Sequence, residues 1–429
     1  MENMNQGIFF ENNYLKSLRE KFYYVDEDPK YGPRIFFENS GGSLRLKKAV
    51  TVKSDIEQFP DCPERIHDRA VELRGLVENG TQEILEIVFG AHSGSLVMEL
   101  SASQTMFQIV GTIMEQVKQG TNAVTSVLEH PSAYDAMAYY CRKTGREFRV
   151  VPANRQTGGI DPDEVMKCVD ENTCVLSIMA ASNISGNIMN IKEIVRRVRK
   201  INPDIYIISD AVQHAPHAAL DVEELQLDAA NIAPYKFFGV RGCGFAYVSE
   251  RVASLPHHKL DARDASDWSL GTPTPANFAA MHEVIQYVCD IGAHFSDSTN
   301  RRTLYVEGMH RIHMQERALL YRLLEGSAAV SGLRHQERVE VFVDMQDLSE
   351  KDLIVAMGIK GIDFTQCVKE YQKRGVTVYE RINTSIYSKR IVEALGLDGA
   401  IRVSPLHCHG PEDVDRFLSI TQKIAREVK

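Results

Sequence analysis

Two residues of opposite charge, Asp210 and Lys236, each stand at the end of an apolar run. Asp210 closes the run IYIISD, and Lys236 follows NIAPY and precedes the glycine-containing segment FFGVRGCG. A carboxylate behind so apolar a strand needs a positive partner, which a protonated pyridine nitrogen supplies. A lysine desolvated by apolar neighbours has a lowered pKa and can attack an aldehyde. Together the two residues predict pyridoxal phosphate chemistry, which needs an acid and a lysine at opposite ends of the ring.

Each of these residues also has a plain structural interpretation. Asp210 could cap the segment that follows it, and Lys236 could lie on the surface with a buried stem. Gln213 and His214 follow Asp210 closely enough to offer a donor to a phenolate oxygen, although this is weak evidence for either residue alone. The prediction of pyridoxal phosphate chemistry therefore depends on the occurrence of both residues at strand ends, and not on either side chain alone.

Two other polar segments join this set. His130, in TSVLEHPSAYDAM, follows a predicted strand and precedes a helix that opens with Pro-Ser, where an imidazole could stack on a flat ring. The segment MELSASQTMFQ begins a helix, so Ser103 and Gln104 could hold a phosphate at a helix N-terminus. The alternatives are an isolated histidine and a helix cap without a ligand.

The elements that must position these residues alternate between strand and helix. Strands are predicted at 122–128, 147–151, 174–182, 205–211, 228–234 and 244–249, with helical stretches between most of them. Such alternation indicates a mostly parallel sheet covered on both faces, with the ligand at the carboxyl ends of the strands. Two helical patterns follow within 276–326, and a smaller α+β unit begins near residue 328.

Composition limits the classes of function. The net charge of -9 is spread along 429 residues without a basic stripe, which argues against a nucleic-acid partner. The sequence contains neither a signal-like N-terminus nor an apolar run of membrane-spanning length, so a cytoplasmic protein without membrane contact is expected. The eight cysteines are scattered without a C-x-x-C pair, and no metal site is predicted from them.

Taken together, the motifs resemble class V of the pyridoxal-phosphate aminotransferases (fold type I), which includes cysteine desulfurases, selenocysteine lyases, isopenicillin N epimerase-like proteins and kynureninase. The matching segments occur in family order from about residue 34: IFFENSGG, SASQT, His130, SNISGNIMNI, DAVQ and PYKFFG. The resemblance implies an α/β protein with a mostly parallel seven-stranded sheet between helices and a smaller C-terminal α+β domain. We expect an N-terminal segment 1–40 that joins the small domain, a large domain 41–295, and a helical connection with the small domain 296–429.

The resemblance also implies a role for each matched residue near the cofactor ring. Lys236 would hold pyridoxal phosphate as a Schiff base and then move protons, and Asp210 would pair with the pyridine nitrogen. Gln213 would contact the ring oxygen, and Asn183 would lie near that oxygen or the substrate carboxylate. His130 would stack on the ring. We count Lys236, Asp210 and His130 as the catalytic candidates.

The phosphate is implied to have contacts from two subunits. Ser103, Gln104 and Tyr235 would hold it within one chain. The segment SLGTPTPANF resembles the family's Gly-Thr turn, so Gly271 and Thr272 would reach the cofactor phosphate of a neighbouring subunit. A homodimer with shared active sites follows from the resemblance.

The substrate side is implied by two segments. AIRVSP resembles the family's Arg-x-Ser strand, so Arg402 would form a bidentate pair with the α-carboxylate of an amino acid. Ser40 of IFFENSGG would lie beside that substrate. The alternative for Arg402 is a structural ion pair.

The sequence departs from the desulfurase pattern in three places. The loop YERINTSIYSKRIVEALGLDG has no cysteine where persulfide-forming members carry one, while Cys367 falls in a predicted helix and Cys408 follows Arg402. Tyr235 precedes the lysine where desulfurases have histidine. Ala-Ser-Gln at 102–104 replaces the usual Gly-Thr-Thr or Gly-Ala-Thr turn.

We therefore expect an enzyme that acts on an α-amino acid through an external aldimine and a Cα carbanion, as a lyase of the cysteine desulfurase-like group. A class V aminotransferase and an amino-acid epimerase stay open as alternatives. A hypothesis of another class is a regulatory protein that binds pyridoxal phosphate without catalysis. The sequence does not identify the amino acid.

Overall fold

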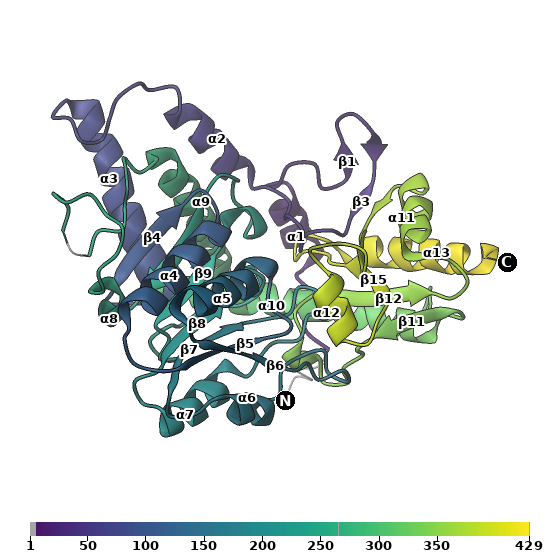
Figure 1. Ribbon diagram of the computed structural model, residues 1–429. Helices are drawn as coiled ribbons and strands as arrows, with labels where there is room; N and C mark the ends of the chain where they lie inside the picture. The colour runs from purple at the N-terminus through teal and green to yellow at the C-terminus, as the bar shows by residue number, and fades with distance from the viewer. Residues whose placement is uncertain (1–5, 265, 429) are drawn as a thin grey trace.

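The larger sheet has seven strands in the order β4-β10-β9-β8-β7-β5-β6 in the computed structural model, which describes residues 6–264 and 266–428 (Figure 1). Strands β5 to β9 run parallel, and β10 is antiparallel to both of its neighbours. The predicted mostly parallel sheet is confirmed. The strands are β4 Ser95–Glu99, β5 Asn122–Ser126, β6 Glu147–Val151, β7 Thr173–Met179, β8 Tyr206–Asp210, β9 Ala229–Ile232 and β10 Gly244–Val248.

Helices cover both faces of this sheet because both faces are apolar. Successive side chains of a strand point to opposite faces, so Ile208 packs with α4 and α5 while its neighbour Ile207 packs with α7 and α9. The helices around the sheet are α2 Lys47–Ile56, α3 Asp68–Glu83 with the π-helical turn η1 Ile84–Phe89, α4 Ala102–Gln116, α5 Pro131–Thr144, α6 Pro162–Cys168, α7 Ile191–Ile201, α8 Glu250–Ala253 and α9 Pro275–Phe295.

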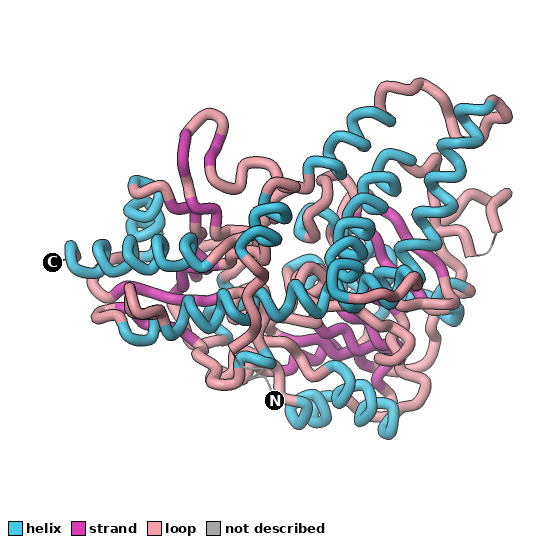
Figure 2. Tube along the Cα trace, turned by 180° about the vertical axis from the view of Figure 1, so that it is seen from behind, coloured by secondary structure: helices cyan, strands magenta, loops and turns pink. Residues whose placement is uncertain are grey.

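A four-stranded antiparallel sheet, β11-β12-β15-β14, forms the smaller unit. Helices α11 and α13 pack on one face of it, and the long helix α10 packs on both hydrophobic cores, with Ile312 in the larger and Leu323 in the smaller. Seen from behind, the strands form two separate groups (Figure 2). The elements are α10 Arg301–Glu325, β11 Val339–Phe342, β12 Val355–Ile359, α11 Phe364–Lys373, β14 Tyr379–Ile382, α12 Lys389–Ala394, β15 Gly399–Val403 and α13 Pro411–Glu427.

The N-terminal segment reaches the smaller unit before the chain enters the larger one. After α1 (Asn12–Arg19) and the short pair β1 (Glu27–Asp28) and β2 (Gly32–Pro33), strand β3 (Ile35–Phe36) pairs parallel with β13 (Val376–Thr377). A single bridge then joins Glu38 to Ser404, directly after β15. This pairing carries residues 38–40 to the side of Arg402. None of the helices described between residues 6 and 428 is long and apolar enough to cross a membrane.

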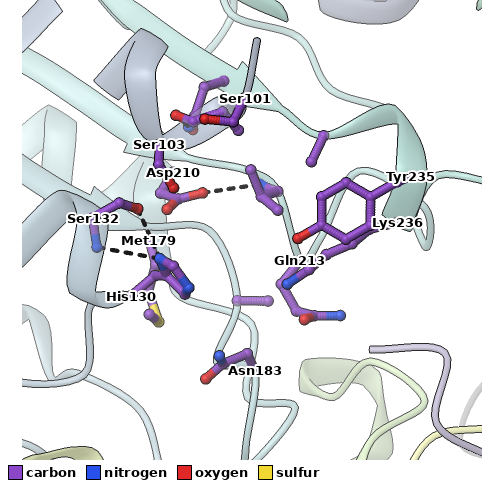
Figure 3. Close-up of a pocket in the computed structure, with 15 residues that line it drawn as sticks. Ser101, Ser103, His130, Ser132, Met179, Asn183, Asp210, Gln213, Tyr235 and Lys236 are labelled. Carbon is purple, nitrogen blue, oxygen red and sulfur yellow. Dashed lines mark hydrogen bonds between the residues drawn. The ribbon is translucent and has the colours of Figure 1, made fainter. Parts of the chain in front are cut away.

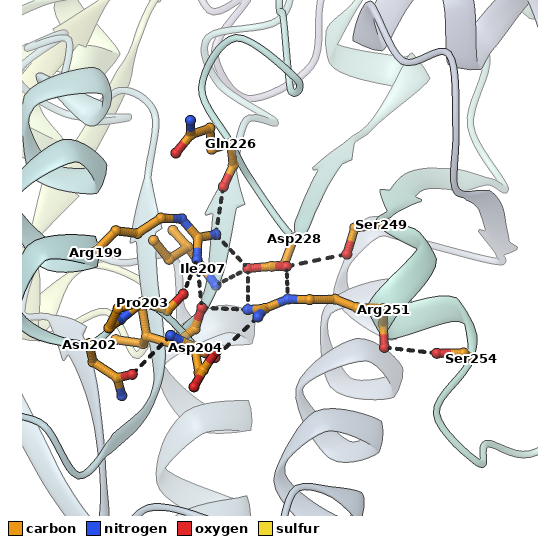
Figure 4. A network of polar contacts seen from close by, with 11 residues as sticks. Arg199, Asn202, Pro203, Asp204, Ile207, Gln226, Asp228, Ser249, Arg251 and Ser254 are labelled. Atoms are coloured by element: carbon orange, nitrogen blue, oxygen red, sulfur yellow. Dashed lines mark hydrogen bonds and ion pairs between the residues drawn. The ribbon is translucent and has the colours of Figure 1, made fainter.

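A buried carboxylate fixes the amino-terminal ends of β8 and β9, opposite the edge at which the candidate residues lie (Figure 4). Asp228 accepts the backbone N–H of Ile207 at 2.8 Å and forms ion pairs with Arg199 of α7 and Arg251 of α8 at 3.1 and 2.9 Å. Its side chain is only 4% exposed. One acid thus ties two helices to the start of the two strands whose far ends carry Asp210 and Lys236.

Candidate active site

A hollow opens at the carboxyl ends of the parallel strands (Figure 3). The loops after β5, β7, β8 and β9 and the start of α4 contribute its walls, which is where an open parallel sheet places its ligand. The structure brings together seven of the residues predicted from the sequence: Ser103, His130, Asn183, Asp210, Gln213, Tyr235 and Lys236.

Asp210 is the last residue of β8 and is 6% exposed. Its Oδ1 accepts the backbone N–H of Val212 at 3.1 Å. Burial raises the pKa of this carboxyl, and the hydrogen bond from Val212 and the charge of Lys236 oppose the rise in part. A carboxylate so desolvated and so weakly compensated favours a cationic group beside it.

Lys236 ends the short 3₁₀ turn η2 (Pro234–Lys236) that follows β9, and it is 8% exposed. Burial lowers the pKa of its amine to about 8, with a further contribution from the positive charge of Arg402. The neutral amine is therefore accessible near physiological pH, as a nucleophile toward an aldehyde requires.

His130 is the N-cap of α5, and its ring is fixed from one side. Nδ1 accepts the backbone N–H of Ser132 at 3.2 Å and lies 2.7 Å from the Ser132 hydroxyl. Burial lowers the pKa of His130 to about 3, helped by the positive charges of Lys236, Arg381 and Arg390. The ring is therefore neutral, and a neutral planar ring is suited to stacking rather than to carrying charge.

The start of α4 forms another wall of the cavity. Ser101 is the N-cap, and its Oγ accepts the backbone N–H of Gln104 at 3.3 Å. Ser101 and Ser103 line the cavity, so the N-terminus of this helix faces the space where an anion would be stabilised. The side chain of Gln104 is exposed and contacts Ser101 instead, which leaves its predicted part in phosphate binding to its backbone.

Several buried polar atoms around the cavity have no partner among the described residues. They are the amide oxygens of Asn183, Gln213 and Asn231. Buried polar groups are normally hydrogen-bonded, so these atoms indicate a ligand with several polar groups. With Asp210, Lys236 and the start of α4, they fit a pyridine ring that carries an aldehyde, a hydroxyl and a phosphate.

Arg402 lies on β15 and is 2% exposed. Its Nη1 donates to the backbone carbonyl of Asn183 at 3.0 Å, and its Nη2 is paired with Glu38. Ser40 stands beside this pair, since its backbone N–H donates to Ser404 Oγ at 3.1 Å. The structure thus places an arginine next to a cavity residue, and it shows the ion pair that was the alternative for Arg402.

Gly271 and Thr272 lie away from this cavity. Both are exposed, and the Thr272 hydroxyl donates to Glu64 at 2.5 Å. Their predicted contact with the phosphate of a neighbouring subunit involves a second chain and stays a prediction. Tyr235 does line the cavity, with its ring stacked against the guanidinium of Arg241.

Sequence reasoning missed several polar residues of the site. Glu129 is fully buried beside His130, accepts the Met179 N–H at 2.9 Å and the Ser126 hydroxyl at 2.6 Å, and has its pKa raised to about 8 by burial. Asn231 of β9 lines the cavity. Glu129 could have been found from the sequence, because it directly precedes His130. Nothing in the sequence distinguishes Asn231 from the other residues of its strand.

The cysteines do not contribute to the described walls of the cavity. All eight are free, and six of them, including Cys367 and Cys408, are buried. Burial raises the pKa of Cys367 to about 12 and that of Cys408 further. The exposed Cys62 lies between α2 and α3. Among the described residues there is also no cluster of three or more His, Cys, Asp or Glu side chains that could hold a metal ion.

Comparison with known proteins identifies the family. The model of the family described as "Aminotransferase class-V" matches residues 36–417. The chain belongs to the class-V aminotransferase family. Members of this family use pyridoxal phosphate, so this class-V protein is a pyridoxal-phosphate-dependent enzyme.

Several relatives with curated names are cysteine desulfurases. This class-V protein is 30% identical to cysteine desulfurase IscS of Dictyoglomus turgidum over 57% of the chain and 60% of that protein. It is 21% identical to a probable cysteine desulfurase of Borreliella burgdorferi over 96% of the chain and 97% of that protein. These matches place the chain in a cysteine desulfurase-like group of the family.

Solved structures confirm the fold. The apo structure of a cysteine desulfurase from Thermococcus onnurineus NA1 matches with a TM-score of 0.81 at 19% identity, covering 96% of this chain and 98% of that one. The cysteine desulfurase CsdA from Escherichia coli matches with a TM-score of 0.79 at 15% identity, covering 98% of this chain and 100% of that one. The fold is therefore fold type I, as predicted.

Proposed function

We propose that this protein binds pyridoxal phosphate through Lys236 and acts as a lyase on an α-amino acid. The observation that carries the proposal is the placement of Asp210 and Lys236, both buried, at the ends of adjacent parallel strands on one cavity. A binding site for an ordinary phosphorylated ligand does not need a buried carboxylate and a lysine of lowered pKa together. This pairing also argues against a purely regulatory protein.

Different side chains of the cavity would bind different parts of the cofactor. When bound, pyridoxal phosphate supplies an electron sink for negative charge at the substrate Cα. Asp210 would hold the proton of the pyridine nitrogen, because its buried carboxylate is stabilised by a cation. Ser101 and Ser103 at the start of α4 would bind the phosphate, and Gln213 would contact the ring hydroxyl. The neutral His130 would hold the ring face.

Lys236 would transfer protons during the reaction. Lys236 would hold the cofactor aldehyde, and its amine, once free and with a pKa that burial lowers to about 8, would accept the proton from the substrate Cα. Arg402 would bind the α-carboxylate by exchanging Glu38 for it. Asn183, whose carbonyl already accepts from Arg402, would fix the position of that arginine relative to the cavity.

We favour elimination at the β carbon over amino transfer or epimerisation. Several curated relatives are named cysteine desulfurases and another is named a selenocysteine lyase, which supports a lyase of that group. No cysteine lines the described part of the cavity, so the departing group would leave without capture by a thiol of this chain. A persulfide route is therefore not part of the proposal.

The cofactor half of the proposal is tested by absorbance. The purified protein, supplied with pyridoxal phosphate, is expected to show a visible band that Lys236→Ala abolishes and Lys192→Ala, an exposed lysine paired with Glu224, leaves unchanged. Borohydride reduction should attach the cofactor to Lys236 and not to Lys351, a buried lysine whose pKa is also about 8. A colourless protein that cannot be reconstituted would refute the proposal.

The reaction is tested by screening amino acids for release of sulfide, ammonia or keto acid and for loss of the α-proton. We expect elimination products. The double variant Cys62→Ser and Cys168→Ser, which removes the two cysteines that are not buried, should keep full activity. Transfer of the amino group without elimination, or loss of sulfide release in the double variant, would contradict the proposed reaction.

A further inference from the structure

A second arginine, Arg381, projects from the same face of the smaller sheet as Arg402. Strands β14 and β15 are antiparallel, with Tyr379 opposite Arg402 and Arg381 opposite Ala400. Residues two apart on a strand share a face, so Arg381 and Arg402 are diagonal neighbours on one face. The methyl side chain of Ala400 fills little of the space beside them.

This face of the smaller sheet is turned toward the larger domain. Ile401 and Val403, on the other face of β15, belong to the core under α11 and α13, whereas Ala400 packs with the core of the larger sheet. Arg402 contacts the backbone of Asn183, which lines the cavity. The second arginine is therefore directed to the same side as the first.

Arg381 also acts electrostatically on the cavity. Its positive charge helps to lower the pKa of His130 and of Lys236, after the larger effect of burial in each case. The pKa of Arg381 itself is lowered to about 10 by burial and by the charge of Arg402. Arg381 thus lies within electrostatic range of both cofactor residues and of the arginine expected to hold the substrate.

The charge of Arg381 is not balanced in the part of the chain that the structure describes. The residue is 9% exposed, its Nη2 donates to the backbone carbonyl of Tyr387 at 3.1 Å, and its Nε has no acceptor. It forms no ion pair, and the carboxylate that attracts it, Glu38, is already paired with Arg402. Two buried guanidinium groups therefore share one carboxylate, which is costly unless a further anion binds.

We propose that Arg381 binds a carboxylate on the side chain of the substrate, so that the enzyme prefers an amino acid that carries a second acidic group in addition to the β substituent that departs; aspartate and glutamate, which lack such a substituent, serve as non-reacting probes of this contact. The inference rests on the proposed function, in which Arg402 takes the α-carboxylate. A dicarboxylic amino acid matches the two guanidinium groups with two carboxylates and leaves Glu38 free to turn away. A neutral amino acid leaves Arg381 buried without an anion.

The isosteric pair L-aspartate and L-asparagine tests the proposal in the holoenzyme. Calorimetric titration is expected to show aspartate binding about 10- to 100-fold more tightly than asparagine, the range for one buried charged hydrogen-bonded pair. L-glutamate and L-glutamine form a second pair that reports the length of side chain preferred. Equal affinity within both pairs would overturn the inference.

The variant Arg381→Gln should reduce the affinity for aspartate to that for asparagine and leave asparagine unchanged. Arg402→Gln is the matched control, because it should weaken both ligands equally. If Arg381 served only to hold the loop at Tyr387, its replacement would weaken both ligands alike and the ratio would survive. Should Arg381→Gln fail to fold, the aspartate-to-asparagine ratio of the native enzyme and of Arg381→Lys decides the question.

The inference and the proposed function can fail separately. A holoenzyme that shows the cofactor band and binds asparagine as well as aspartate would refute the role of Arg381 and leave the pyridoxal phosphate site intact. Absence of the band after reconstitution would instead refute the proposed function, and the inference with it.

Discussion

The carboxylate of Glu38 forms an ion pair with the guanidinium group of Arg402. The carboxylate comes from the N-terminal segment and the arginine from β15, and the two side chains form an ion pair that is 15% and 2% exposed. A substrate carboxylate must compete with Glu38 for the same guanidinium. The pair therefore holds the arginine in place in the free protein and sets a cost for binding substrate.

Replacing Glu38 by Gln should lower the stability of the protein and at the same time strengthen substrate binding. Removing one partner of a buried ion pair leaves the other charge uncompensated, so the free energy of unfolding should fall by about 3 kcal/mol. The same uncompensated arginine should bind amino acids more tightly, which predicts a KM several-fold lower at unchanged kcat. Urea unfolding and steady-state kinetics measure the two effects, and an increased KM would show that Glu38 supports the substrate site instead.

Arg402→Ala should raise KM for an α-amino acid about 100-fold, because a bidentate pair with the α-carboxylate is lost. The affinity for pyridoxal phosphate should change little, since the cofactor residues lie on the larger sheet. Cofactor titration by absorbance provides the control. If KM stayed the same, the carboxylate site would have to lie elsewhere.

The rate at which cofactor-free protein takes up pyridoxal phosphate should rise about tenfold per pH unit below pH 8 and level off above it. The pKa of Lys236 is lowered to about 8, and only the neutral amine attacks the aldehyde. Stopped-flow absorbance between pH 6 and 10 would measure the profile. A rate that kept rising past pH 9 would indicate an amine of ordinary pKa.

His130→Phe should retain most of the affinity for the cofactor, whereas His130→Ala should lose about tenfold or more. The pKa of His130 is lowered to about 3, so the native ring is neutral and a phenyl ring can replace its face. Cofactor dissociation constants of the two variants give the comparison. Equal losses in both would assign His130 a hydrogen-bonding role.

Asp228→Asn should lower the free energy of unfolding by about 3 kcal/mol, because Arg199 and Arg251 lose their shared buried partner. Asp163→Asn, which removes an exposed pair with Arg197, should cost less than about 1 kcal/mol. Both can be measured by urea unfolding. Substrate affinity should be unaffected, since Asp228 lies at the opposite end of the strands.

Local patterns were sufficient to predict the strands that carry the cofactor residues. The apolar runs before Asp210 and Lys236 are long and clear, and parallel strands bring their carboxyl ends to one edge without further information. Strand β4 and the central strand β12 of the smaller sheet were not predicted. Strand β4 pairs with β10, which is distant in the sequence, and β12 pairs with the preceding β11 and the more distant β15.

The substrate side could not be predicted in full for the same reason. Glu38 reaches Arg402 only because β3 pairs with β13, and Arg381 shares a face with Arg402 only in the observed register of β14 with β15. Register between distant strands is set by tertiary packing, which one sequence does not display. Gln104 was expected in the cavity because a helix start was visible, but the direction of its side chain was not.

The contacts proposed for the cofactor come mainly from the seven-stranded sheet, and the two arginines proposed for the substrate come from adjacent strands of the other sheet. Chemistry and selectivity are thus encoded in separate stretches of the chain. Substitutions at positions 379–382 and 399–403 can change which amino acid is accepted while the machinery that activates it stays intact. New substrate preferences can therefore arise by few mutations, without rebuilding the catalytic centre.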